Sequence, residues 1–317
     1  MISRRLLRIK IFQVLYAYHK NNDDRSVIKA EKELFHSISK FYDLYHAIIV
    51  MLIDLHDHAA HRIDMEKSRF TKQNPEVLKT QIFVDNPIIT TLRNNAQLSK
   101  YISENNISWS NNQDIVKALY TEMEKTEWFK AFISKNSPMF ADYSELLVTI
   151  LIDLFATSPD LQQVLEENSI YWNDELEFAL TLAMKTIQRV KPETGVGMAI
   201  PALFKDLEDK DFAKDLLRKC ITNAPEYNEI IVRFTKNWEF DRIAFADVLL
   251  LTLALAEFIE FPSVPTKVTI NEYIEISKYY STAKSSVFIN GVLDKALREL
   301  KNEGKIKKIG RGLIGEV

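Results

Sequence analysis

The sequence VPTKVTINEYIEISKYYSTAKSSVFINGVLDK, residues 264–295, decides the fold of this 317-residue chain. Its apolar side chains recur every three or four residues on both sides of a polar corner at residues 281–286, which predicts two helices joined by a turn. Asn290-Gly291 interrupts the apolar pattern of the second helix. A glycine inside a helix costs about 1 kcal/mol relative to alanine, so its presence suggests that something packs closely against the backbone there.

The opposite end of the chain is basic and amphipathic. Arg4, Arg5 and Arg8 lie in a segment without an acidic residue before Asp23. A core stripe of helical spacing is formed by Leu7, Ile11, Leu15 and Tyr18. Arg5, Arg8 and Phe12 fall on a neighbouring face, and guanidinium groups beside an aromatic edge suit phosphate contact and base stacking. The alternative interpretation is a solvated helix end, since charge runs are usually surface.

Composition favours an all-α protein. The chain has 46% hydrophobic residues but only 7 glycines and 9 prolines. Its formal net charge of −3 means that nucleic-acid binding would need a local basic patch. Cys220 is the single cysteine, which excludes an internal disulfide and fits a reducing cytoplasm. The longest apolar runs are far shorter than the ~18 residues that would span a membrane.

Both chain ends resemble the NusB family of bacterial transcription antitermination factors. Residues 264–295 are similar to its C-terminal half, and Arg4-Arg5-x-x-Arg8 followed by Gln13-Val14-Leu15-Tyr16 is similar to its first helix. The resemblance covers roughly residues 1–42 and 209–300, and implies two helical bundles. The N-terminal bundle would comprise residues 1–44 and 209–240, interrupted by a helical insertion at 45–208. Residues 241–300 would form the C-terminal bundle, and 301–317 a basic tail with mobile last residues.

The resemblance implies a non-enzymatic protein without a cofactor. It would bind boxA-type RNA of ribosomal RNA transcripts together with the ribosomal protein NusE, and help RNA polymerase resist termination. The expected RNA-binding residues are Arg4, Arg5, Arg8, Lys284, Ser285, Phe288 and Asn290. The expected NusE-binding residues are Tyr16 and Asp247. The pattern departs from the family at Ala283-Lys284, where many relatives have an acidic pair, and at Val287, where a lysine is frequent.

Structural roles compete with these assignments. Phe288 could anchor the core and Asn290 could satisfy a buried hydrogen bond. Tyr16 could be a partly buried core residue, and Asp247 could simply favour the N-terminal end of its helix. A different function class, a non-catalytic scaffold that binds proteins through the insertion, is the alternative to RNA binding. The two differ in salt dependence, which is steep only when phosphates are contacted.

Three further patterns point to other chemistry. Asp54, His58 and His61 share one helical face, but a solvated face is favoured over a metal site. GxGxxG at residues 310–315 lacks the strand before it and the helix after it that a dinucleotide site needs. NusB-like domains also precede certain ribosomal RNA cytosine methyltransferases, but this chain has no catalytic domain or pair of reactive cysteines.

Within the insertion, the sequence ISENNISW (102–109) is similar to LEENSIYW (165–172). This similarity by itself indicates only coincidence.

Overall fold

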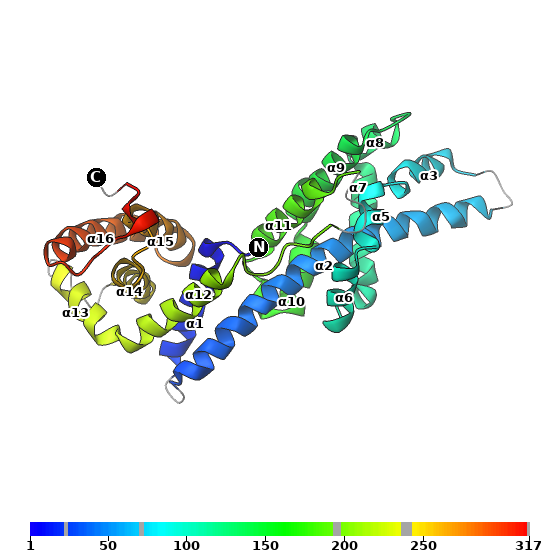
Figure 1. Cartoon of the computed structure of the whole chain (residues 1–317). Helices are drawn as coiled ribbons and strands as arrows, with labels where there is room; N and C mark the ends of the chain where they lie inside the picture. Colours follow the sequence, from blue (N-terminus) through cyan, green and yellow to red (C-terminus); the bar gives the residue numbers. More distant parts are fainter. Residues whose placement is uncertain (22–24, 70–72, 193–197, 236–242, 316–317) are drawn as a thin grey trace. The chain divides into compact units, whose positions relative to one another are not determined.

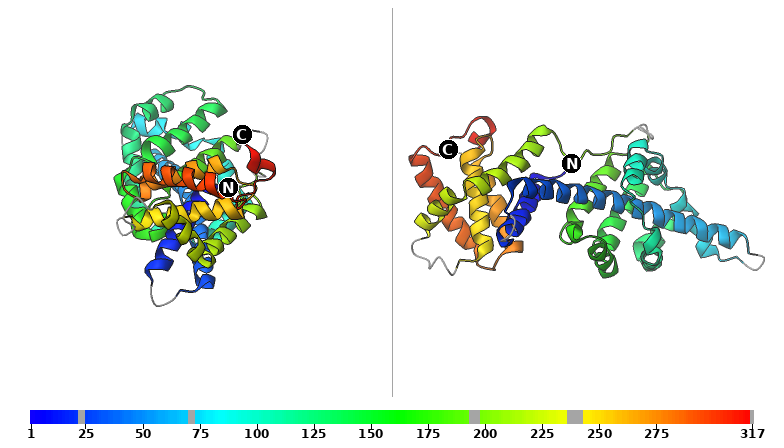
Figure 2. Two further views of the ribbon diagram at one scale, coloured as in Figure 1. Left: turned by 90° about the vertical axis from the view of Figure 1, so that its left-hand side faces the viewer. Right: turned by 90° about the horizontal axis from the view of Figure 1, so that it is seen from below.

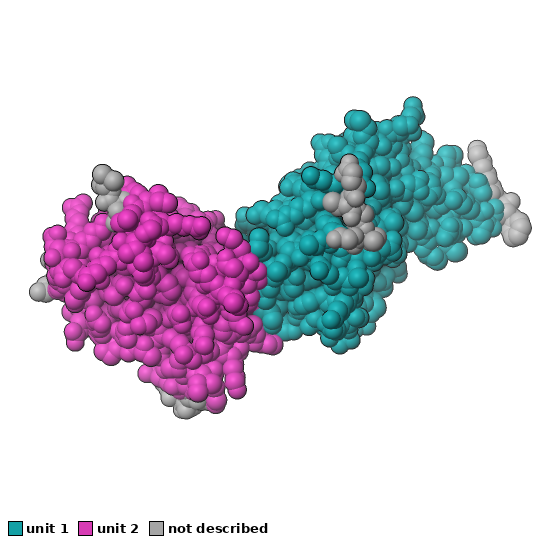
Figure 3. All heavy atoms as spheres, in the orientation of Figure 1, with its two compact units in different colours: residues 1, 39–203 teal, residues 2–38, 204–317 magenta. Residues whose placement is uncertain are grey.

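The computed structural model describes residues 1–21, 25–69, 73–192, 198–235 and 243–315, and all regular secondary structure in these ranges is helical (Figure 1). The all-α prediction is therefore confirmed. The chain divides into two compact units (Figure 3). Unit 1 comprises Met1 and residues 39–203, and unit 2 comprises residues 2–38 and 204–317.

Unit 2 is built around one central helix. Its helices are α1 (Arg4–Lys20), the start of α2 (Val27–Lys67), α12 (Leu207–Thr222), α13 (Ala224–Phe234), α14 (Phe245–Glu260), α15 (Thr266–Tyr280) and α16 (Ser285–Asn302). Helix α14 contacts α1, α12, α13, α15 and α16 (Figure 2). Most of its side chains are buried, which explains why residues 248–256 read as a nearly continuous apolar run.

Unit 1 consists of the remainder of α2 and shorter helices that follow it. They are α3 (Pro75–Lys79), α4 (Gln81–Val84), α5 (Pro87–Arg93), α6 (Ala96–Glu104), α7 (Gln113–Lys125), α8 (Glu127–Ile133), α9 (Phe140–Thr149), α10 (Pro159–Asn168) and α11 (Leu176–Arg189). A π-helical segment, η2 (Ile150–Phe155), continues α9, and two 3-10 turns, η1 (Ser110–Asn112) and η3 (Ile170–Trp172), complete the unit. Helix α2 is continuous over its 41 residues.

Side-chain caps explain where several of these helices begin. The Asn86 side chain accepts hydrogen bonds from the backbone N–H groups of Ile88 and Ile89, and Pro87 occupies the first position of α5. Asn74 and Ser158 precede prolines in the same way at α3 and α10. The Thr126 hydroxyl accepts a hydrogen bond from the Phe129 N–H at 3.3 Å, and this cap separates α7 from α8.

The described part of the basic tail packs against the other helices of unit 2. Lys308 Nζ donates to the backbone carbonyls of Glu257 and Phe261, at 3.3 and 2.9 Å, and so satisfies the C-terminal end of α14. The 3-10 turn η6 (Gly310–Leu313) approaches Pro262 so closely that a Cβ on Gly312 would lie 1.9 Å from the Pro262 oxygen. Close packing, not nucleotide binding, therefore accounts for this glycine in the GxGxxG pattern.

A buried ion pair joins the first helix to the central one. Arg8 donates two hydrogen bonds to Glu257, Nε to Oε2 at 2.8 Å and Nη2 to Oε1 at 2.7 Å, and both residues are almost fully buried. Thr269 and Tyr273 of α15 donate to the same carboxylate at 2.7 and 3.1 Å. Burial alone would raise the pKa of Glu257, but Arg8 and these hydroxyls lower it, so the pair remains charged.

The Asp54 face of α2 lies in unit 1. The His58 ring packs against Tyr120 with 5.0 Å between centroids. Burial and the neighbouring Asp57 raise the pKa of Asp54 to about 6. Within the described ranges no group of three histidine, cysteine or acidic side chains could hold a metal ion. In those same ranges, no helix is both long enough and apolar enough to cross a membrane.

We expect Arg8→Met to destabilise unit 2 by about 3–5 kcal/mol, because it leaves the Glu257 carboxylate buried without its charge partner. Urea unfolding followed by circular dichroism measures the change. Arg5→Met is the matched control, because the Arg5–Glu272 pair has a 44% exposed guanidinium side chain and should contribute at most about 1 kcal/mol. An Arg8→Met/Glu257→Gln double variant should recover part of the loss. Equal effects of Arg8→Met and Arg5→Met would contradict this role.

We expect Asp54→Asn to stabilise the protein at pH 7 but not at pH 3.5. The folded-state pKa of Asp54, about 6, lies above the ordinary aspartate pKa of 3.8. The stability that the neutral Asp54 carboxyl contributes is therefore fully present below pH 3.8 and is lost as the pH rises through 6. The asparagine side chain is uncharged at every pH, as the Asp54 carboxyl is only at low pH. Thermal unfolding at intervals between pH 3.5 and 7 checks this, and a constant difference between parent and variant would refute it.

Candidate nucleic-acid interface

The three arginines of α1 are all bound to carboxylates of unit 2. Arg4 pairs with Glu208 and Asp209 at 2.8 and 2.7 Å, and its guanidinium lies 5.0 Å from the centre of the Phe212 ring.

Arg5 makes a two-bond pair with Glu272, both bonds at 2.9 Å, and remains 44% exposed. Arg8, which the sequence pattern suggests as a phosphate contact, is 2% exposed and lies in the core. Its guanidinium points at Glu257 because burial requires a partner for the charge, so the structure places it out of reach of a ligand.

The corner between α15 and α16 is held by a buried carboxylate. Asp247, in the first turn of α14, accepts hydrogen bonds from the hydroxyls of Ser281 at 2.6 Å and Ser285 at 2.8 Å. Ser285 Oγ also accepts from the Thr282 N–H at 3.1 Å. Asp247 and Ser285 are 4% and 1% exposed. Both were expected to contact partners, but the structure places them inside the corner, where they fix its shape.

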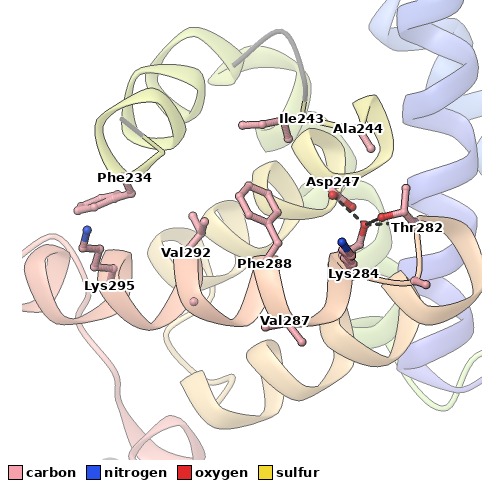
Figure 4. A pocket seen from close by; sticks show the side chains of 13 residues that line it. Phe234, Ile243, Ala244, Asp247, Thr282, Lys284, Val287, Phe288, Val292 and Lys295 are labelled. Atoms are coloured by element: carbon pink, nitrogen blue, oxygen red, sulfur yellow. Dashed lines mark hydrogen bonds between the residues drawn. The ribbon is translucent and has the colours of Figure 1, made fainter. Parts of the chain in front are cut away.

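An open groove lies beside this corner (Figure 4). Its volume is about 1020 Å³. It is lined by Phe234, Ile243, Ala244, Asp247, Thr282, Ala283, Lys284, Ser285, Val287, Phe288, Gly291, Val292 and Lys295. Phe288 and Val292 project from the same side of α16, Phe288 toward Ile243, and Phe234 of α13 lies beside Lys295 at the end of the groove opposite Lys284 (Figure 4). The groove therefore has an aromatic and aliphatic floor between two cations.

The row Lys284, Phe288, Gly291 and Lys295 follows from helical geometry. These positions are separated by four, three and four residues, so they share one face of α16. Lys284 and Lys295 are exposed, and neither forms an ion pair with a described residue. Sequence reasoning missed Lys295, although its spacing from Lys284 places it on the same face. Phe288 and Asn290 are half-buried, and Asn290 makes no side-chain hydrogen bond within the described part of the chain.

Gly291 differs from the expectation drawn from the sequence. A Cβ placed there would find no atom within 4 Å, so nothing in the described chain packs against this backbone. The residue is exposed and lines the groove. Its lack of a side chain leaves room for an external group to approach the helix backbone between Phe288 and Lys295. Val287, the departure from the family pattern, is 77% exposed at the same rim.

Tyr16 lies on a separate aromatic surface formed with Phe245, His19 and Lys20. Its ring is 42% exposed and meets the Phe245 ring edge-on, with 5.4 Å between centroids. Lys20 Nζ lies 4.6 Å from the Phe245 ring centre. Tyr16 is therefore partly exposed, with its apolar ring supported from one side, an arrangement typical of interface tyrosines.

The groove suits an unstacked base and its flanking phosphates. An aromatic side chain offers a stacking surface, and the two lysines offer charge at both ends. Cys220 is not a reactive alternative, because it is buried in α12 and burial raises the pKa of its thiol well above the usual value.

Comparison with known proteins identifies the family. The NusB family profile matches residues 179–298, which include α12 to α15 and most of α16 but not α1. The transcription antitermination protein NusB of Salinibacter ruber is 45% identical over 113 residues, 36% of this chain and 71% of the relative. That of Chloroherpeton thalassium is 36% identical over 140 residues, 44% of this chain and 66% of the relative.

NusB of Natranaerobius thermophilus is 36% identical over 89 residues, which are 28% of this chain and 64% of the relative. No solved structure matches the chain at a significant level. Because its similarity to the Salinibacter protein extends over more than two thirds of that relative, this chain belongs to the NusB family.

Proposed function

We propose that this protein is a transcription antitermination factor that binds boxA-type RNA of ribosomal RNA transcripts together with the ribosomal protein NusE. Family membership supports the antitermination role. The observation that carries the RNA assignment is the α16 groove, in which an aromatic ring lies between two lysines without ion-pair partners in the described chain. The protein binds and positions, and catalyses no reaction.

The α16 groove would hold one short stretch of single-stranded RNA. Lys284 and Lys295 would contact phosphates, and the Phe288 ring would receive a base. Gly291 would allow the strand to lie against the helix. Asn290, whose amide has no hydrogen-bond partner in the described chain, would add a donor and an acceptor at the groove edge.

The arginines of α1 would contribute less than the lysines. Arg4 and Arg5 must exchange a carboxylate for a phosphate to bind RNA. Because these carboxylates already neutralise part of the guanidinium charge, the two arginines would attract a phosphate less strongly. Arg8 would support the interface only by holding α1 against α14. Ser285 would act in the same indirect way, through the corner that presents Lys284.

The Tyr16 surface would bind NusE. Its aromatic rings and Lys20 provide a half-apolar face of the kind enriched in protein interfaces. Asp247 would contribute by fixing the α15–α16 corner, since its carboxylate is occupied by Ser281 and Ser285.

Replacing both groove lysines should weaken RNA binding and reduce its salt dependence. We expect Lys284→Ala/Lys295→Ala to lower the slope of log affinity against log salt by about two, roughly one for each lost phosphate contact. Fluorescence anisotropy with labelled boxA RNA, with and without NusE, measures the slope. Lys278→Ala is the matched control, because Lys278 is exposed but paired with Glu275. An unchanged slope in the double variant would favour a protein-binding scaffold.

Filling the groove at Gly291 should weaken RNA binding without unfolding the helix. We expect Gly291→Leu to bind boxA RNA at least about tenfold more weakly, because the added side chain occupies the space left for the strand. Its thermal stability should match or exceed the parent, since glycine in a helix interior costs about 1 kcal/mol. Gly291→Ala provides the small-volume control. Full RNA affinity in a folded Gly291→Leu protein would exclude this groove.

A further inference from the structure

Two tryptophans in unit 1 attach to α2 in the same way. Trp109 Nε1 donates to the Ala47 carbonyl at 2.8 Å, and Trp172 Nε1 donates to the Lys40 carbonyl at 2.8 Å. The two carbonyls are seven residues apart, which is two turns of one helix. Two turns place both anchors on the same side of α2, about 10 Å apart.

The anchored segments are the ones that echo each other in sequence. ISENNISW follows from the end of α6 and LEENSIYW from the end of α10, and each tryptophan closes its segment. A 3-10 turn accompanies each, η1 directly after Trp109 and η3 ending at Trp172. The two segments therefore share a structural role, attachment to α2 through a tryptophan. Their sequence similarity alone did not establish this role.

A polar groove of about 350 Å³ lies between the two segments. It is lined by Lys40, Asp43, Ala47, Asn105, Asn106, Ile107, Ser108, Trp109, Asn111, Asn112, Asn168, Ser169, Tyr171 and Trp172. Five of these residues are asparagines, from both segments and η1. Asn106 has a φ of 53°, a left-handed conformation that costs energy for a residue with a side chain and is often found at binding sites.

A second hollow of about 220 Å³ shares Trp172 with this groove. It carries the carboxylates of Glu166, Asp174 and Glu177. In the asparagine groove the one lysine, Lys40, is held by Asp43 at 2.8 Å, and Asp43 also accepts from the Tyr101 hydroxyl. The combined surface is therefore rich in amides and negatively charged at one end, with its single cation already paired.

We propose that this surface, the asparagine groove with its acidic end, binds an extended protein segment that carries basic side chains. An asparagine amide offers a donor and an acceptor in one plane, which matches the N–H and C=O groups of a peptide backbone. The spacing between the two anchors, about 10 Å, equals about three residues of extended chain. Lysine or arginine side chains of the segment would then reach the carboxylates beyond Trp172.

The charge distribution selects a peptide over a nucleic acid. RNA binding requires cations for phosphates, and this groove offers only a lysine that is already paired. The surface lies in unit 1. Its lining residues are outside the α16 groove and outside the part of the chain that matches the NusB profile. The inference is therefore independent of the proposed RNA binding, and the variants that test each do not overlap.

The test is selection of a random octapeptide display library on the full chain. Selected peptides should be enriched in lysine and arginine, and synthetic copies should bind in fluorescence polarisation. Asn106→Gly/Asn168→Ala should weaken them by about tenfold, through loss of amide hydrogen bonds. Glycine suits the φ of 53°, so the Asn106 change does not threaten the fold. Glu166→Gln/Glu177→Gln should weaken binding and remove its preference for basic peptides.

Asn136→Ala is the matched control, because Asn136 is exposed in the α8–α9 turn and does not line the groove. It should bind the same peptides with unchanged affinity. The proposal is overturned if no selected peptide loses affinity in the asparagine variant, or if groove-dependent peptides lack basic residues. It is equally overturned if a random-sequence RNA pool binds the parent chain and is lost in the asparagine variant.

Discussion

The ion pair between Arg8 and Glu257 is the interaction on which unit 2 depends. The two residues are 249 positions apart in sequence, and their paired hydrogen bonds bring the first helix against the central one. Hydroxyls of Thr269 and Tyr273 add α15 to the same carboxylate. A buried charge is tolerated only with its partners in place, so this site strongly restricts how α1, α14 and α15 can pack. Residues 39–203, all of unit 1 except Met1, lie in sequence between the two charged residues.

This constraint changes which cations are available to a ligand. Three arginines make the opening of the chain look like a phosphate-binding helix, yet each one is matched to a carboxylate of α12, α14 or α15. The available charge lies instead on α16, at Lys284 and Lys295. Lys284 places a cation on the rim of the α16 groove. The exposed cations therefore lie in the second half of the resemblance, on α16.

Periodicity predicted the helices of unit 2 well, because each buries one apolar face against α14. It could not predict the role of Arg8, since the partner carboxylate becomes visible only when the helices are packed. The hydrogen bond between Ser285 and Asp247 could not be predicted for the same reason, because short polar side chains near a turn show no partner until the corner between α15 and α16 is folded. Lys295 could have been found, because its spacing of eleven residues from Lys284 is three helical turns. The paired tryptophan anchors needed the structure, since two similar octapeptides alone do not show a common contact.

The basic tail also contains a cation that is engaged within the fold. Lys308 points its ammonium at two carbonyls that end α14, and Gly312 lets the turn η6 approach Pro262. A cation engaged in this way stabilises the fold and offers little attraction to a phosphate, whatever the local excess of lysine and arginine. A count of basic residues therefore overestimates how many cations are available to a phosphate at each end of this chain. A cation is available to a phosphate only if it has no carboxylate partner. Among the residues that the structure describes, Lys284 and Lys295 on α16 have none, and the Phe288 ring lies between them.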